Sequence, residues 1–529
     1  MTTPASSISQ KLARTRASYD ATPYESFPLI RQQPARMAAA AAWFGLKAPS
    51  AARARVLEIG CAAGGHIIPL AAAWPNAEFL GIDLSAVQIA QGQARVARLK
   101  LANIALEPRS LDEIDAKDGA FDFIICHGVF SWIPEPLREA LLGVIAERLT
   151  PEGVAAVSFN VLPGWRLFQV ARDSLILHAR LQNEPEARAA QARELFELMS
   201  AESNDRYSYG RFWRDEARRM ASGGDAYIAH EIFEDENSPL TFTDFCAALD
   251  RHGLAYLGEC NVSANSQESM AAAGAASIRR LASGDDRARE QYIDIFSGRA
   301  FREALVVQRA HAAAIKREIP IARMDAFHFV PPLTLKSLPP SEEHKGWRIG
   351  EQDGGILVEE EAVAMAFDRL IARLPGSSTL EDMAPAAATD SALRRRIADA
   401  LARLVVLGHC AISTEPVVCA SRLKDRPRAW PLAAADAAVG DWTASLRHAP
   451  VRLEPLQRLY LPLLDGTRAR DDLIAHAADL AAKGMLRFRG PEGRIEGRDS
   501  IVARVGPATD ACLKSLLRLG LLMGDEPPA

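Results

Sequence analysis

The stretch Val56–Gly65, VLEIGCAAGG, decides the fold of this chain, because an apolar run leads there directly into a glycine-rich turn. A strand followed by such a turn is typical of α/β domains that hold a nucleotide at the carboxyl end of the strand. Glu58 lies near the outer end of the predicted strand. The kind of nucleotide therefore depends on why a carboxylate stands there.

Strand-like and helix-like segments alternate after this turn. Further strands are predicted at 77–84, 103–108, 121–133, 154–161, 254–260 and 301–309, and helices at 66–75, 85–100 and 137–149. This alternation predicts a parallel sheet with right-handed crossovers, whose ligand lies at the carboxyl ends of the strands. The predicted fold class is α/β, with a Rossmann-like sheet of seven strands.

The rest of the sequence predicts a helical insertion and a C-terminal α+β region. Two similar segments, at 401–410 and 516–525, each predict a helix that ends in a strand, as in winged-helix domains. The expected units are a cap segment at 1–50, a nucleotide-binding core at 51–165 and 254–315, a helical lid or regulatory insertion at 166–253, a linker at 316–355, and winged-helix-like domains at 356–420 and 440–529.

Composition narrows the class of protein. The chain has 529 residues, a net charge of -5 and seven cysteines without a CxxC pair. These features predict several domains, reduced thiols in a cytoplasmic protein and no metal site. No segment resembles a secretory signal or is long enough to insert into a membrane.

The glycine pattern alone leaves two ligands open. Gly60, Ala62 and Gly65 fit a relaxed GxGxxG, and Asp83 ends the second predicted strand at the distance expected of a ribose-binding acid. An NAD-binding domain would carry the same features.

The charge of Glu58 favours a different nucleotide. Two unit charges about 4 Å apart interact by roughly 4 kcal/mol at an effective dielectric constant near 20, so a carboxylate would repel a pyrophosphate. S-adenosylmethionine carries a sulfonium and an ammonium and no phosphate, so the same carboxylate would attract it. The pattern therefore predicts S-adenosylmethionine as cofactor, with S-adenosylhomocysteine as product.

The predicted cofactor site follows from the strand ends. Ser110 or Leu111 would lie near the adenine, and His127 and Gly128 near the transferred methyl group. The complete set of predicted cofactor-binding residues is Tyr24, Glu58, Gly60, Cys61, Ala62, Gly64, Asp83, Leu84, Gln88, Ser110, Leu111, His127 and Gly128.

Three quoted motifs, LEIGCAAGG, GIDLS and FDFIICHGVFSWI, resemble class I S-adenosylmethionine-dependent methyltransferases. YDATPYESFP, CHGVFSWIP and SFNVLPGWR resemble the branch with a methyltransferase regulatory domain, whose characterised relatives are rickettsial protein-lysine methyltransferases acting on outer-membrane proteins. The resemblance implies methyl transfer to a protein, with a lysine amine as acceptor. A small metabolite as acceptor, and a non-catalytic regulator that binds the cofactor and docks partners, stay open.

Methyl transfer to lysine requires a neutral amine, so a desolvating aromatic pocket or a base is expected. The candidate catalytic residues are His127, Trp132, Tyr19 and Tyr209, and the candidate substrate-binding residues are Trp132, Trp165, Tyr207 and Tyr209. His127 would act either as a base or as a hydrogen-bond partner of the cofactor. Asp20 and His230 are weaker candidates.

The C-terminal region contains the arginines 394, 395, 396 and 403 on its longest predicted helix. Three successive arginines spread around a helix instead of lining one face, and the whole chain is acidic. We therefore expect a protein-docking or homodimerisation module here and not a nucleic-acid-binding one.

Overall fold

The computed structural model describes residues 4–182, 184–202, 206–221, 225–266, 270, 272–342, 345–351, 354–385, 390–486, 489–490, 493–494 and 498–524. A seven-stranded sheet forms its centre, with the strand order β3-β2-β1-β4-β5-β7-β6. β7 runs antiparallel to both of its neighbours, and the other strand pairs are parallel. The predicted α/β class with a seven-stranded sheet is confirmed, but the sheet is mixed and not parallel throughout as predicted. The strands are β1 (Arg55–Ile59), β2 (Glu78–Asp83), β3 (Ile104–Pro108), β4 (Phe121–Cys126), β5 (Leu149–Asn160), β6 (Leu254–Glu259) and β7 (Phe301–Gln308).

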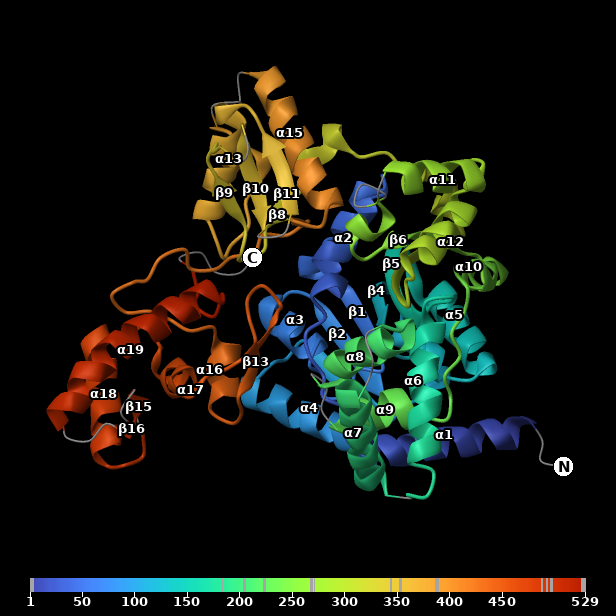
Figure 1. The fold of residues 1–529 in the computed structure, drawn as a ribbon, viewed down its shortest axis with the longest axis horizontal. Coiled ribbons are helices and arrows are strands. Elements are labelled where there is room, and N and C mark those ends of the chain that lie inside the picture. The colour runs from blue at the N-terminus through green and yellow to red at the C-terminus, as the bar shows by residue number, and fades with distance from the viewer. Residues whose placement is uncertain are drawn as a thin grey trace.

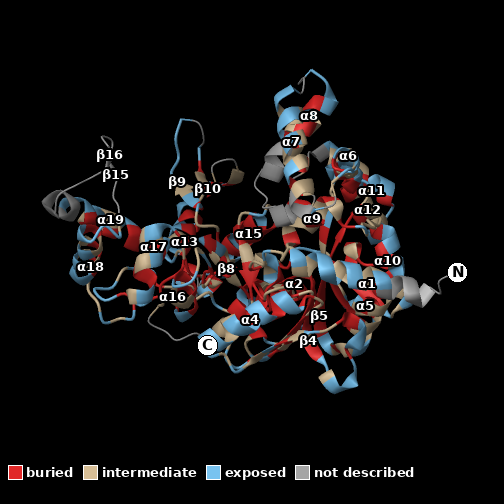
Figure 2. Cartoon of the chain, turned by 90° about the horizontal axis from the view of Figure 1, so that it is seen from below, coloured by how far each residue is buried: buried red, intermediate tan, exposed pale blue. Residues whose placement is uncertain are grey.

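Helices cover both faces of the sheet, as its apolar strands require. α2 (Pro34–Trp43), α3 (Ile67–Ala73) and α4 (Ala86–Leu99) precede and connect the first strands, and α5 (Glu135–Arg148) joins β4 to β5. Ser85 caps α4 by accepting a hydrogen bond from the Gln88 backbone N–H at 3.2 Å. Figure 2 shows the buried strands behind helices whose outer surfaces are exposed. β1 and β4 are neighbours, so the segments that follow them meet at one edge of the sheet.

The insertion after β5 has a hydrophobic core of its own. Trp165, Phe168, Phe196 and Trp213 pack together in this core. Its helices are α6 (Trp165–His178), α7 (Pro185–Glu202), α8 (Ser208–Ala221) and α9 (Asp225–Phe233). Figure 1 shows them gathered on one side of the sheet, near α1 (Pro4–Ala21).

α10 (Phe242–Arg251), which also lies within the predicted insertion, packs instead against the sheet through Phe245 and Leu249. It is followed by β6, and α11 (Ala272–Ala282) and α12 (Asp286–Ser297) lie between β6 and β7.

The region predicted as a linker at 316–355 contains strands. β8 (His328–Val330) pairs with β12 (Ala411–Ser413), and β9 (Lys336–Leu338), β10 (Trp347–Glu351) and β11 (Gly354–Val358) form an antiparallel sheet. Glycine is required in this sheet for close packing, because a Cβ on Gly350 would lie 2.1 Å from the Gly354 carbonyl oxygen. Composition alone predicted a linker, because proline and glycine are common both in linkers and in a small packed sheet such as this one.

Two further units complete the chain. The first places α13 (Glu361–Ala372), α14 (Leu380–Met383) and α15 (Ser391–Val406) beside the small sheet. The second consists of α16 (Pro431–Ala437), β13 (Trp442–Ala444), β14 (Pro450–Arg452), α17 (Pro455–Tyr460), α18 (Arg470–Ala482), β15 (Arg489–Gly490), β16 (Gly493–Arg494) and α19 (Arg498–Arg518).

One continuous cluster of buried apolar side chains joins these two units to α2 and to one face of the large sheet. Figure 1 shows the second unit beside α3 and α4. On α15, Arg394 pairs with Asp325, and Arg396 donates to Glu360 at 2.7 Å. Within the described part of the chain, none of the helices has the length and apolar character needed to cross a membrane.

Candidate active site

The loop after β1 has a backbone conformation, with positive φ angles, that only a few residue types adopt easily. Gly60 and Gly64 have φ angles of 78° and 74°, and Ala62 lies between them at 49°. A Cβ on Gly60 would approach Val129 Cγ2 to 2.5 Å, so glycine is required here for space as well as for conformation. The loop therefore presents its backbone closely at the edge of the sheet, as the sequence predicted.

Glu58 stands at this edge as a buried carboxyl group, one of whose oxygens lacks a partner among the described residues. The residue is 4% exposed, and its Oε2 has no hydrogen-bond partner within the part of the chain that the structure describes. Burial, and secondly the charge of Asp83, raise the pKa of Glu58 well above its usual value, whereas the Ile67 backbone lowers it. A carboxyl group in this state would gain a strong interaction from an arriving cation.

Asp83 is held by the loop and by the start of α4. Its Oδ2 accepts from Ala62 N and its Oδ1 from Ser85 N, both at 2.8 Å. The Ser85 hydroxyl donates to Asp20 at 2.6 Å, so the end of α1 reaches the same corner. The sequence did not indicate this contact, which joins residues 65 positions apart.

The side expected to hold adenosine is built from three neighbouring segments. Leu84 follows Asp83, and Ser110 and Leu111 follow β3, where both are buried. The Ser110 hydroxyl donates to Asp112, and Glu113 accepts from Ser110 N at 2.7 Å. Gln88 is fully buried, and neither its amide nitrogen nor its amide oxygen has a partner among the described residues.

His127 belongs to a polar cluster that the sequence analysis missed. Its Nδ1 lies 2.6 Å from Gln32 Nε2, which also donates to Glu303 Oε1 at 3.1 Å. Because the Gln32 amide nitrogen donates to both, His127 Nδ1 is an acceptor and its proton resides on Nε2. Burial lowers the pKa of His127, so the ring is neutral at physiological pH. Beside it, Gly128 (φ 68°) donates to Ser158 Oγ at 2.8 Å.

An N-terminal segment lies directly on the glycine loop. Gly65 N donates to Ser26 Oγ at 2.9 Å, and a Cβ on Gly65 would lie 2.0 Å from the Ser26 carbonyl oxygen. The Tyr19 ring stacks on His230 at 4.1 Å, and Tyr24 lies 5.8 Å from the same ring. Tyr19 and Tyr24 thus pack against His230, which lies on α9 of the insertion.

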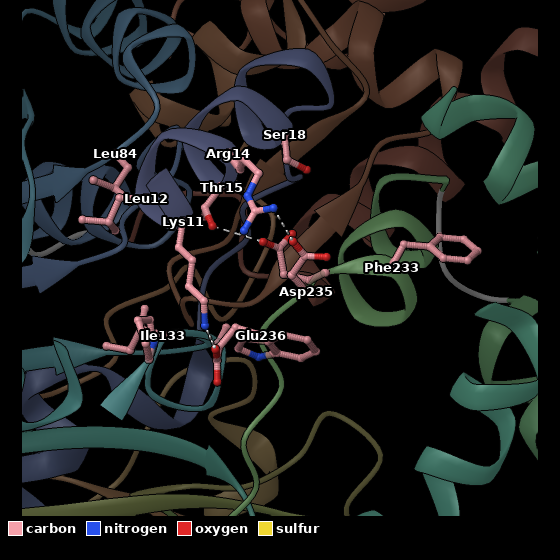
Figure 3. Close-up of a pocket in the computed structure, with 13 residues that line it drawn as sticks. Lys11, Leu12, Arg14, Thr15, Ser18, Leu84, Ile133, Phe233, Asp235 and Glu236 are labelled. Atoms are coloured by element: carbon pink, nitrogen blue, oxygen red, sulfur yellow. Dashed lines mark hydrogen bonds and ion pairs between the residues drawn. The ribbon is translucent and has the colours of Figure 1, made fainter. Parts of the chain in front are cut away.

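A cavity of about 170 Å³ opens beside this edge (Figure 3). Trp132 and Ile133, from the segment after β4, and Leu84, from the segment after β2, line it together with Phe233. Its other lining residues come from α1 and from the loop Glu234–Glu236, which we call the acidic loop. The cavity thus lies between the predicted cofactor edge and the insertion.

The acidic loop already holds cationic side chains of α1. Lys11 Nζ lies 3.1 Å from Glu236 and Arg14 3.8 Å from Asp235, and Thr15 Oγ1 donates to Glu234 at 3.3 Å (Figure 3). Lys11, Arg14 and the acidic loop were not predicted as part of the site, although Tyr19 of the same helix was, because their contacts join residues more than 200 positions apart. An acidic run between a helix and a polar turn gave no local signal of this role.

Three of the predicted substrate residues do not line the cavity. Tyr207 and Tyr209 are 68% and 54% exposed, because the buried side of α8 is occupied by Trp213. Trp165 is buried in the core of the insertion, where its Nε1 donates to Asn237 at 2.9 Å and its ring meets Trp132 edge-on. Only Trp132 of this predicted set faces the cavity.

The residues present fit a cationic nucleoside. The buried Oε2 of Glu58 and both amide atoms of Gln88 await partners, and Cys61 is a buried thiol whose pKa is raised by burial. A pyrophosphate would meet Glu58 and Asp83 as like charges.

Three families match parts of the chain. "Methyltransferase domain" matches residues 56–153, "Predicted methyltransferase regulatory domain" matches 224–308, and "PKMT, C-terminal winged helix domain" matches 425–521. An uncharacterised protein of Rickettsia prowazekii is 28% identical over 91% of this chain and 89% of its own length. A second uncharacterised protein of that organism is 31% identical over 44% of this chain and 92% of its own length.

The fold also matches a solved structure over nearly its whole length. PKMT2 from Rickettsia typhi superposes with a TM-score of 0.82 at 23% identity, covering 95% of this chain and 100% of that one, and its structure in complex with AdoHcy gives the same values. The chain belongs to the class I S-adenosylmethionine-dependent methyltransferases that carry a methyltransferase regulatory domain and a PKMT C-terminal winged-helix domain.

Proposed function

We propose that this enzyme transfers the methyl group of S-adenosylmethionine to the side-chain amine of a lysine in a protein. The observation that carries the proposal is the cavity beside Trp132, whose acidic loop already binds an ammonium and a guanidinium group. A cavity that accepts Lys11 and Arg14 suits a basic segment of a protein acceptor. The likeness to PKMT2 of Rickettsia typhi supports the same acceptor.

The cofactor would lie along the edge formed by the glycine loop. Bound S-adenosylmethionine supplies an electrophilic methyl group on a sulfonium. Glu58 would face its ammonium group, and the backbone from Gly60 to Gly64, with Cys61 and Ala62, would hold its methionine part. Asp83 would bind the ribose hydroxyls in addition to its present partners. The remaining contacts would come from Tyr24, Leu84, Gln88, Ser110, Leu111, His127 and Gly128.

The walls of the cavity would prepare the acceptor. A free lysine has a pKa of about 10.4, and contact with apolar walls lowers it. Trp132 and Phe233 supply such walls, and the acidic loop at the rim would attract the ammonium form before it enters. Catalysis would then rest on aligning the neutral amine with the methyl group and on excluding water.

His127 would contact the cofactor and would not act as a base. Its Nδ1 already accepts from Gln32, so its Nε2 proton remains free to be donated. Burial raises the pKa of Tyr19 well above its usual value, so Tyr19 would act as a neutral wall residue.

The acidic rim also bears on the alternatives. A polycarboxylate metabolite would meet the three carboxylates of the acidic loop as well as Lys11 and Arg14, so the cavity offers it no net positive charge. A non-catalytic regulator would bind the cofactor without using Trp132.

The test is methyl transfer from a labelled donor to host proteins, to basic peptides and to small-molecule extracts, followed by mass spectrometry of lysines. Labelled protein lysines are expected. Trp132→Ala should abolish most of the labelling, whereas Tyr207→Ala, which changes an exposed aromatic residue outside the cavity, should keep it. Labelling of small molecules alone, or cofactor binding without any transfer, would refute the proposal.

Three further proposals concern the setting of the enzyme. A cytoplasmic location agrees with all seven cysteines being free thiols. A homodimer through the C-terminal region is tested by light scattering of the full chain. The unit limits proposed from sequence are tested by limited proteolysis, which should cut within 316–355 only if that segment behaves as a linker.

A further inference from the structure

One side chain of the winged-helix unit, that of His448, reaches the edge of the large sheet where we propose that the cofactor binds. β13 and β14 form a hairpin whose turn, Ser445–Ala449, contains His448. His448 is 5% exposed and has a φ of 57°, a conformation that costs a non-glycine residue about 1–2 kcal/mol. The turn is closed by hydrogen bonds from His448 N to the Ser445 carbonyl at 2.8 Å and from Ala449 N to Ser445 Oγ at 3.2 Å.

His448 meets the residue that directly follows the glycine loop. Its Nε2 lies 2.7 Å from Nδ1 of His66, and the two rings pack edge to face at 4.8 Å. Leu29 N also donates to His66 Nδ1, at 3.1 Å. His66 Nδ1 is therefore an acceptor, and His448 Nε2 carries the proton of the bond. Segments 382 and 37 positions away in the sequence converge on this one atom.

The same hairpin also contacts the N-terminal segment that covers the glycine loop. The Trp442 ring lies 5.0 Å from Phe27, and the Arg447 carbonyl accepts from Gln33 Nε2 at 3.3 Å. A second contact joins the units at Asp436 of α16, which accepts from Arg95 of α4 at 2.6 Å and 3.0 Å and from Thr443 of β13 at 3.0 Å. The unit is thus anchored to the core independently of His448.

The imidazole pair is uncharged. Burial lowers the pKa of His66 to about 3 and the pKa of His448 well below its usual value, and the neighbouring His127 and Arg36 act in the same direction. The hydrogen bond therefore persists through the physiological pH range, and its role is to hold the hairpin against the glycine loop.

We propose that His448 is a positioning residue, which fixes the glycine loop through His66 and so makes cofactor affinity depend on the winged-helix unit. The inference rests on the proposed placement of the cofactor on that loop. Reciprocity of binding free energies requires that the cofactor in turn stabilises the hairpin.

The experiment uses the full-length chain and four variants. His448→Leu removes the donor while keeping side-chain volume, and His448→Gln places an amide N–H near the position of Nε2. Asp436→Asn weakens the second contact between the units, and Glu58→Gln tests the placement of the cofactor. Calorimetry with S-adenosylhomocysteine, steady-state kinetics and thermal unfolding are measured on each.

We expect His448→Leu to raise Kd for S-adenosylhomocysteine and KM for S-adenosylmethionine roughly tenfold, with kcat within about twofold of the unmodified enzyme. His448→Gln should restore most of the affinity. Asp436→Asn should leave affinity unchanged even where it lowers the unfolding temperature.

In hydrogen exchange, S-adenosylhomocysteine should slow exchange in residues 442–452, and His448→Leu should remove this protection.

Equal losses of affinity in His448→Leu and Asp436→Asn, or no recovery in His448→Gln, would show that the unit only stabilises the fold. Unchanged affinity in His448→Leu together with weakened binding in Glu58→Gln would overturn this inference alone. Unchanged affinity in Glu58→Gln would overturn the placement of the cofactor.

Discussion

Buried carboxylates occur at two places along the large sheet and its covering helices, and they differ in whether the chain supplies a cation. At the far edge, Arg302 is fully buried and binds Glu259, Glu290 and Asp294, with its guanidinium over the Phe242 ring. At the cofactor edge, Glu58 has no cation of its own, and its Oε2 is unpaired among the described residues. We infer that the carboxylates paired with an internal cation stabilise the fold, and that Glu58 is available to bind a cationic ligand.

Glu259 and Glu58 differ in their pKa as well, although burial raises the pKa of Asp294, beside Arg302, to about 6. The charges of Arg302 and Arg299 lower the pKa of Glu259 despite its burial. Burial dominates at Glu58 and raises its pKa. The charges around Glu259 therefore favour its ionised form, whereas burial favours the protonated form of Glu58.

Removing the internal cation should have the largest effect. Arg302→Met leaves Glu259, Glu290 and Asp294 buried without their shared cation, which costs about 3–5 kcal/mol of unfolding free energy. Chemical denaturation should show this loss. The control is Arg309→Met, whose partly exposed pair with Asp250 contributes about 0–1 kcal/mol. Equal losses in both variants would end the distinction between the two groups.

Replacing the Glu58 carboxylate should weaken cofactor binding and leave the stability of the fold unchanged or higher. A hydrogen bond to a charged group contributes about 1.5–3 kcal/mol, so Glu58→Gln should weaken binding of S-adenosylhomocysteine by roughly ten- to a hundredfold. The ligand-free variant should be at least as stable as the unmodified enzyme, because a buried ionisable group has been removed. A destabilised variant with normal binding would contradict this.

The same carboxyl group sets a pH dependence with a defined sign. Its folded-state pKa lies above its unfolded value, so its stabilising contribution is complete below the unfolded pKa and is lost as pH rises through the folded pKa. The ligand-free enzyme should therefore lose stability over that window, and Glu58→Gln should reduce the loss. Denaturation at a series of pH values measures this difference, and identical profiles would refute it.

The acidic loop should show a smaller effect, because Asp235 is exposed and Glu236 is half-buried. Asp235→Asn with Glu236→Gln should raise KM for a basic peptide a few-fold, mainly at low salt. The KM for S-adenosylmethionine should not change. A salt-independent effect, or an effect on the cofactor alone, would place the acidic loop elsewhere in the mechanism.

The smallest effect is expected at Ala62. Its φ of 49° is unfavourable for alanine, so Ala62→Gly should stabilise the folded protein by about 1 kcal/mol or less. Thermal unfolding measures the gain, and a loss of stability would show that the methyl group packs usefully.

The seven strands and the loop at Gly60–Gly65 were predictable, because they follow from local periodicity and from one turn. Gln32, Glu303, His66 and His448 were not, because their contacts join segments far apart in the sequence. Tyr207 and Tyr209 were predicted as a binding wall because they belong to an aromatic cluster, but Trp213 is the one buried aromatic residue of 206–213. Local sequence indicates which residues occupy the end of a strand, and tertiary packing decides which other elements reach it.

The most direct test of the account is the proton balance of cofactor binding. Calorimetric titration of S-adenosylhomocysteine in buffers of different ionisation enthalpy, from about pH 5 to about pH 8, counts the protons exchanged. The account predicts that binding releases a proton as Glu58 ionises against the ligand ammonium, and that Glu58→Gln abolishes this release. Proton uptake, or the same release in Glu58→Gln, would contradict it.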